Sequence, residues 1–85
     1  MRWEEVRQAY PEQWVIIEAI KAKTELNRRI IEQLTVVDRF DDGNKALLKY
    51  LQLHKEYRER EFYVVHTSRL ELDIEEQRWI GVRAY

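Results

Sequence analysis

The side chains best suited to chemistry are an imidazole and two hydroxyls in the run His66-Thr67-Ser68. A histidine beside a serine or threonine offers a general base and a nucleophile. Neighbouring side chains of a strand point to opposite faces, so His66 cannot face Thr67 but can reach Ser68. No acidic residue to orient the imidazole and no Gly-x-Ser-x-Gly motif accompanies the pair. A small hydrolase-like enzyme around His66 is therefore our third hypothesis, and we expect the run to mark a strand end and a turn.

Metal chemistry has little support in the spacing of the ligand types. His54 and His66 fall on different predicted elements, and the chain has no His-x-x-x-His pattern and no cysteine. The run 41–44 groups oxygen ligands around a glycine but lacks the alternation and closing glutamate of a calcium loop, so it predicts a helix cap. The paired carboxylates at 4–5 and 75–76 are typical of solvated charges. We predict no metal site, no cofactor and no catalytic residue.

The best candidate surface for nucleic acid is the tip of a predicted hairpin. It carries Lys21, Lys23, Arg28 and Arg29, and a basic β-ribbon can enter a major groove. The 15 basic and 16 acidic side chains are interleaved and give a formal net charge of -1, whereas nucleic-acid binders usually show a basic excess. The motifs of RNA-recognition and KH modules are absent. A nucleic-acid-binding or regulatory module is our second hypothesis.

That hairpin is predicted by two β-branched apolar segments, Trp14–Thr24 and Ile30–Phe40, which flank a polar turn. If the two strands pair symmetrically about Asn27, both faces of the hairpin are apolar near its open end. The expected pairs are Trp14 with Phe40, Ile20 with Leu34, Thr24 with Ile30, and Ile17 with Val37. This register predicts that Ile20 is buried. The alternative is one helix over 12–34, using the helical spacing of the same apolar residues.

Two helices are predicted outside the hairpin. Arg2–Tyr10 has apolar residues at helical spacing, and Pro11 prevents its continuation. Asn44–Arg58 follows capping oxygens in Asp41-Asp42. Its apolar stripe is expected to consist of Leu47, Tyr50, Leu51 and His54.

The remaining segments predict further strands. Glu61–Thr67 is rich in aromatic and β-branched residues, and Trp79–Val82 forms a short extended segment. Residues 69–76 alternate with a period of two, which favours a strand, but Thr67 or Ser68 with Glu71 also has the form of a capping box before a helix. The order α-β-β-α-β-(β) predicts a single α+β domain over residues 1–85, with an antiparallel sheet made of the hairpin plus one or two further strands and with two helices.

Composition limits the environment of this domain. The absence of cysteine excludes a disulfide framework and favours a reducing compartment. The N-terminus has no apolar signal region, and no apolar run approaches the roughly 18 residues that a membrane span needs. We expect a full-length cytoplasmic protein with no membrane partner.

Three segments carry a resemblance over nearly the whole chain: 10–15 (Tyr-Pro-Glu-Gln-Trp-Val), 61–68 (Glu-Phe-Tyr-Val-Val-His-Thr-Ser) and 79–83 (Trp-Ile-Gly-Val-Arg). Together with the length, they resemble a group of short bacterial proteins of unknown function. The resemblance implies a bacterial cytoplasmic protein, and it implies no catalytic residue.

The aromatic content favours protein interaction as the first hypothesis. Trp14, Phe40 and Phe62 are expected in the core, while Tyr63 and Trp79 are candidates for an interface. The second apolar face of the hairpin must be covered either by the N-terminal helix or by another subunit. We therefore predict a non-enzymatic domain that acts through self-association, as a homodimer, or through another protein partner. The predicted interface residues are Val15, Ile17, Val37, Tyr63 and Trp79.

Overall fold

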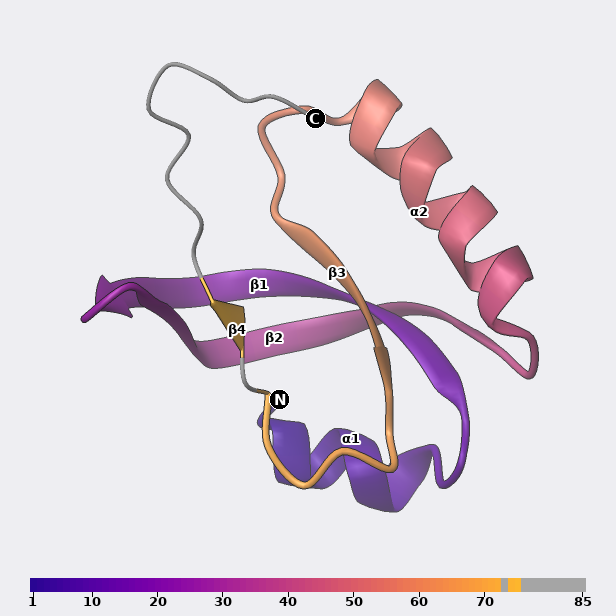
Figure 1. Cartoon of the computed structure of the whole chain (residues 1–85), viewed down its shortest axis with the longest axis horizontal. Coiled ribbons are helices and arrows are strands. Elements are labelled where there is room, and N and C mark those ends of the chain that lie inside the picture. The colour runs from indigo at the N-terminus through magenta and orange to yellow at the C-terminus, as the bar shows by residue number, and fades with distance from the viewer. Residues whose placement is uncertain (73, 76–85) are drawn as a thin grey trace.

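The computed structural model of this chain describes residues 1–72 and 74–75 (Figure 1). Its elements are α1 (Trp3–Ala9), β1 (Trp14–Glu25), β2 (Arg28–Phe40), α2 (Gly43–Glu56), β3 (Phe62–His66) and β4 (Ile74–Glu75). The strands form one antiparallel sheet in the order β3-β1-β2-β4. The predicted α+β fold class and element order are confirmed, and the alternative of one helix over 12–34 is wrong. The predicted extended segment Trp79–Val82 lies outside the described residues.

Capping hydrogen bonds mark the start of both helices, and a proline follows the end of α1. The Glu5 side chain accepts the Arg2 N–H at 2.8 Å at the start of α1, and Pro11 cannot extend the helix. At the start of α2, Asp42 Oδ1 accepts the Asn44 N–H at 2.8 Å, which confirms the predicted cap. A Cβ atom at Gly43 would lie 3.0 Å from the Trp14 indole, which is closer than ordinary van der Waals contact. The first turn of α2 therefore packs tightly against the open end of the hairpin.

The register of the hairpin matches the prediction at its open end and differs from it along most of the remaining length. Trp14 pairs with Phe40 as expected, but Ile17 pairs with Val36 and Leu34 pairs with Ala19. The turn is formed by Leu26 and Asn27, both with positive φ, so it is centred half a residue before the predicted position. Three shifts interrupt the pairing of β1 with β2, and the one between Ala19 and Lys21 takes Ile20 out of the ladder.

Ile20 consequently lies outside the core. Its side chain is 58% exposed, whereas Leu34, its predicted neighbour, is buried. The prediction that Ile20 is buried was wrong because an irregularity in a strand changes the face to which the following side chains point.

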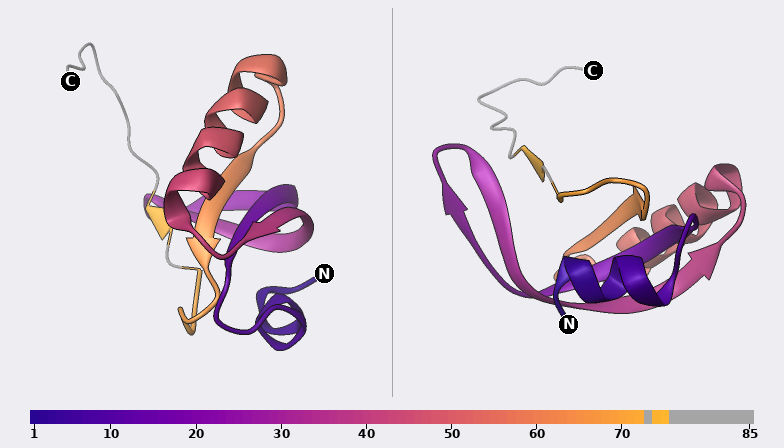
Figure 2. Two further views of the ribbon diagram at one scale, coloured as in Figure 1. Left: turned by 90° about the vertical axis from the view of Figure 1, so that its right-hand side faces the viewer. Right: turned by 90° about the horizontal axis from the view of Figure 1, so that it is seen from below.

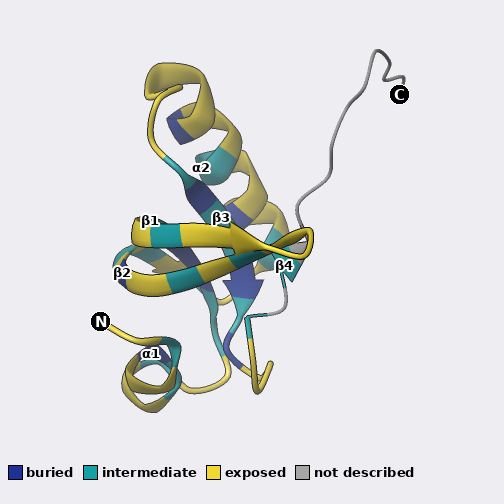
Figure 3. Ribbon diagram, turned by 90° about the vertical axis from the view of Figure 1, so that its left-hand side faces the viewer, coloured by how far each residue is buried: buried dark blue, intermediate teal, exposed yellow. Residues whose placement is uncertain are grey.

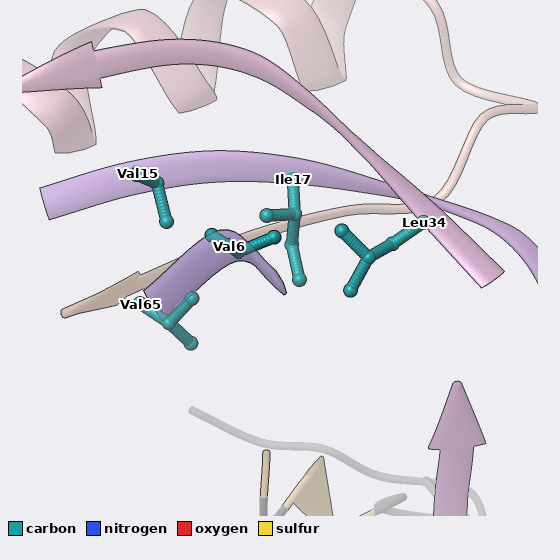
Figure 4. Close-up of a cluster of buried hydrophobic side chains, with 5 residues drawn as sticks. All are labelled: Val6, Val15, Ile17, Leu34 and Val65. Atoms are coloured by element: carbon teal, nitrogen blue, oxygen red, sulfur yellow. The ribbon is translucent and has the colours of Figure 1, made fainter. Parts of the chain in front are cut away.

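The sheet is covered on both faces by elements of the same chain (Figure 2). On one face, Val6 of α1 packs with Val15, Ile17, Leu34 and Val65 (Figure 4). On the other face, Leu53 of α2 packs with Ile16 and Phe62, and Phe40 packs at the margin. The two helices and the sheet thus form three layers, with α1 and α2 on opposite sides.

In its described part, the alternating segment after β3 is neither a long strand nor a helix. Residues 67–72 form turns and bends, and of the described residues in this segment only Ile74–Glu75 pair with β2. No helix formed by the described residues is long and apolar enough to cross a membrane.

Candidate interaction surface

The His66–Ser68 contact that the sequence allows is present. His66 Nδ1 lies 2.9 Å from Ser68 Oγ and also accepts the Ser68 backbone N–H at 3.2 Å. The imidazole packs edge-on against Trp14, with the ring centres 5.1 Å apart. In the described part of the chain, no carboxylate hydrogen-bonds this ring. The contact therefore has the geometry of a local turn in which the imidazole nitrogen caps the following backbone.

Thr67 points away from His66, as the alternation of strand side chains predicts, and it is buried. Its hydroxyl donates to the Tyr10 carbonyl oxygen at 2.6 Å and accepts the Gln13 N–H at 3.0 Å. Its own carbonyl oxygen accepts from Arg7 Nε at 3.0 Å. These bonds attach the end of β3 to α1 and to the turn before β1, which gives Thr67 a structural role.

The histidines do not converge on a metal site. His54 stacks on Tyr50 one turn earlier in α2, with the ring centres 5.8 Å apart, whereas His66 ends β3. Within residues 1–72 and 74–75, no three His, Cys, Asp or Glu side chains are grouped so as to hold a metal ion.

The basic hairpin tip is partly neutralised by carboxylates. Lys23 Nζ lies 3.1 Å from Glu25, and Arg29 donates two 2.8 Å hydrogen bonds to Glu61. Lys21 is exposed, and the Arg28 backbone pairs with that of β4. Lys23 and Arg29, which were predicted to contact nucleic acid, thus already have acidic partners, and this reduces the attraction of the surface for phosphates.

Glu61 is the centre of a small polar network. The Arg29 guanidinium lowers the pKa of the Glu61 carboxyl, chiefly through their hydrogen bonds. The Tyr63 hydroxyl donates to the same carboxylate, and burial together with this negative charge raises the pKa of Tyr63. Tyr63, a predicted interface residue, is half-buried and uses its polar atom within the chain.

A second ion pair ties β1 to the segment before β3. Arg60 donates two hydrogen bonds to the mostly buried Glu18, one of them from Nε at 2.7 Å. These bonds lower the pKa of Glu18. The same guanidinium lies 5.0 Å and 5.2 Å from the ring centres of Tyr57 and Phe62. The connection after α2 is therefore held down on the sheet.

A cavity of about 320 Å³ lies between α1, the distal part of β2 and the segment that leads to β4. Trp3, Ile31 and Leu72 contribute apolar side chains to its wall. The Trp3 Nε1–H donates to the Arg69 carbonyl oxygen at 2.9 Å, and Arg29 is held by Glu61. Because these polar groups already serve the fold, we assign no ligand to the cavity.

Of the predicted interface residues, Val15 and Ile17 are completely buried under α1. A partner could reach them only by displacing that helix, so their assignment to an interface is wrong. The sequence left open whether α1 or a second subunit covers this face, and α1 does. Val37 is 37% exposed, and Trp79 lies outside the described residues.

Three exposed leucines lie close together on α2, a helix that is exposed along much of its length (Figure 3). Leu47, Leu48 and Leu51 are 48%, 68% and 52% exposed, and we call them the leucine face. Ala46 and Leu53 point to the sheet and are buried. The expected apolar stripe was therefore wrong for Leu47, Leu51 and His54, which are exposed.

The sequence held a signal for this surface. Six apolar residues, at 46, 47, 48, 50, 51 and 53, surround more than half of the helix circumference, which is wider than one packing face requires. The expected stripe omitted Leu48, although Leu48 lies three residues before Leu51.

Comparison with protein-family models, with curated proteins and with solved structures finds no match to this chain. The resemblance to short bacterial proteins therefore stays a prediction.

Proposed function

We propose that this chain is a non-enzymatic domain that acts by self-association through the leucine face of α2. The observation that carries the proposal is the exposure of Leu47, Leu48 and Leu51 side by side on a helix whose opposite side is packed on the sheet. Single exposed leucines are common, but adjacent ones on a fixed element form a patch that association would remove from water. A symmetric dimer uses the same patch on both chains and needs no second surface.

The location of this dimer is proposed to be the bacterial cytoplasm. The absence of cysteine supports a reducing compartment, and the resemblance described above supports a bacterial origin.

The leucine face is small, so the association should be weak. An interface built on three leucines per chain buries an area at the low end of the range for protein–protein interfaces. We therefore expect a dissociation constant in the micromolar range. Equilibrium sedimentation over a range of micromolar concentrations should show the mass of one chain at the dilute end and of two chains at the concentrated end. A mass of one chain throughout would contradict self-association.

Variants locate the contact. Leu48→Lys should give a folded monomer, because a lysine within the leucine face would have to bury its charge in the dimer. The matched control is Gln52→Lys, an exposed position beside the leucine face, which should leave the dimer intact. Val37→Lys tests the sheet surface predicted from the sequence. If Val37→Lys dissociates the dimer and Leu48→Lys does not, the dimer uses the sheet and our assignment to α2 is wrong.

A further inference from the structure

We infer that the two α2 helices of this dimer pack antiparallel, with the partner's Lys55 beside Asp41. The inference rests on the proposed self-association and adds its orientation and its electrostatic component. It follows from how charge is distributed along the leucine face.

The charged side chain that shares the leucine face is at its C-terminal end. Lys55 lies four residues after Leu51 and seven after Leu48, which places the three on one side of the helix. The same helical spacing places Lys45 and Glu56 beside the leucine face and not on it. At the other end of the face, Asn44 lies four residues before Leu48, and Asp41 and Asp42 precede the helix.

Two of these charges have no partner within the described chain. Asp42 caps Asn44, but the Asp41 carboxylate makes no hydrogen bond or ion pair with any described residue, and the same holds for the Lys55 ammonium. Both side chains are exposed: Lys55 lies on the C-terminal part of the leucine face, and Asp41 lies two residues before the first residue of α2. Each is therefore available to a second copy.

Only one relative orientation of two such faces is complementary. In an antiparallel pair centred between Leu48 and Leu51, residue 44 of one chain lies opposite residue 55 of the other, which brings each Asp41 close to the partner's Lys55. A parallel pair would place Asp41 beside Asp41 and Lys55 beside Lys55. The antiparallel arrangement also pairs the positive N-terminal end of one helix dipole with the negative end of the other.

Helix geometry gives this arrangement a measurable distance pattern. With a rise of 1.5 Å per residue, positions 44 and 55 lie about 8 Å on either side of the centre. In the antiparallel dimer, positions 44 and 55 of different chains are neighbours, while the two copies of position 44 are about 16 Å apart along the axis. In a parallel dimer, the two copies of position 44 are neighbours.

Because the chain has no cysteine, introduced cysteines report these distances directly. Full-length Asn44→Cys and Lys55→Cys variants are prepared separately, checked by sedimentation, and oxidised alone and as an equal mixture. We expect rapid disulfide formation between the two different variants in the mixture and slow cross-linking of either variant alone, since a disulfide requires Cβ atoms roughly 4 Å apart. Lys45→Cys, on the flank of α2, is the matched control and should cross-link slowly with every variant.

The outcomes separate the two proposals. If the wild-type chain is monomeric throughout, self-association itself fails. If the wild-type chain is dimeric and each variant cross-links rapidly with itself, the helices are parallel and only the orientation is overturned. If no combination cross-links rapidly although Leu48→Lys abolishes the dimer, the leucine face is the contact but the inferred alignment of the two helices is wrong.

Discussion

The hydroxyl of Thr67 donates a 2.6 Å hydrogen bond to the carbonyl oxygen of Tyr10, a residue 57 positions earlier in the chain. The same hydroxyl accepts the Gln13 N–H, and the Thr67 N–H donates to the Gln13 carbonyl oxygen at 2.9 Å. One buried side chain thus closes the turn between α1 and β1 onto the end of β3. This turn includes Glu12, whose positive φ is unfavourable for a residue with a side chain. Thr67 helps to hold that conformation.

Thr67→Val should therefore destabilise the protein by about 2 kcal/mol, because the change removes the hydroxyl but keeps the shape and leaves two backbone groups without partners. Thr67→Ser retains the hydroxyl and should recover most of the loss. The measurement is the free energy of unfolding in urea. Equal losses for the two variants would show that the methyl group, and not the hydroxyl, is responsible.

The two isoleucines at positions 17 and 20 should respond differently to the same change. Ile17 is completely buried and packs with Val6 and Leu34, so Ile17→Ala should cost about 3 kcal/mol. Ile20 is largely exposed, and Ile20→Ala should cost less than about 0.5 kcal/mol. Urea unfolding of the pair checks the irregular register directly. A large loss of unfolding free energy for Ile20→Ala would contradict the irregular register and support the register symmetric about Asn27.

The hairpin shows what the sequence could and could not predict. The β-branched residues of both segments determine that strands form, since their side chains pack well on a pleated surface. The register depends on one turn and on three shifts within the paired strands. Leu26 occupies a positive φ that favours Gly or Asn, so no local signal identified it as a turn residue. The irregularity that displaces Ile20 lies between Ala19 and Lys21, and no local sequence signal marked it either.

The candidate surface also has features that the sequence predicted and features that it could not predict. Helical spacing and the Asp42 cap predicted α2, but apolar residues around most of its circumference left open which side faces the sheet. The His66–Ser68 contact was predictable because it is local. The Glu18–Arg60 and Arg29–Glu61 pairs join residues 42 and 32 positions apart, and charged residues are too numerous in this chain for spacing to select these partners.

The Arg29–Glu61 pair predicts a loss of stability in acid. Hydrogen bonds from Arg29 lower the pKa of Glu61 in the folded state below its ordinary value of 4.5. A carboxyl with a lowered pKa stabilises the fold above that ordinary value, and this contribution is lost as the pH falls through the folded-state pKa. Glu61→Gln should be less stable than the wild type by about 1 kcal/mol at neutral pH.

The difference between wild type and Glu61→Gln should shrink as the pH is lowered below 4.5, because the wild-type carboxyl is then protonated as well. Urea unfolding at a series of pH values gives both curves. Glu18→Gln is a useful comparison, since Arg60 lowers the pKa of Glu18 in the same way. A difference between wild type and Glu61→Gln that stays constant with pH would show that the Glu61 charge does not stabilise the fold.

Charge reversal tests the electrostatic part of the antiparallel dimer. Lys55→Asp places an aspartate beside the partner's Asp41 in both symmetric contacts, so the dissociation constant should rise by about tenfold, and less at high ionic strength. The double variant Asp41→Lys with Lys55→Asp restores opposite charges and should recover most of the affinity. Lys45→Asp carries the same change in net charge on the flank of α2 and should have little effect. Equilibrium sedimentation at low and high salt measures all four proteins. If the double variant is as weak as Lys55→Asp alone, residues 41 and 55 do not meet across the interface.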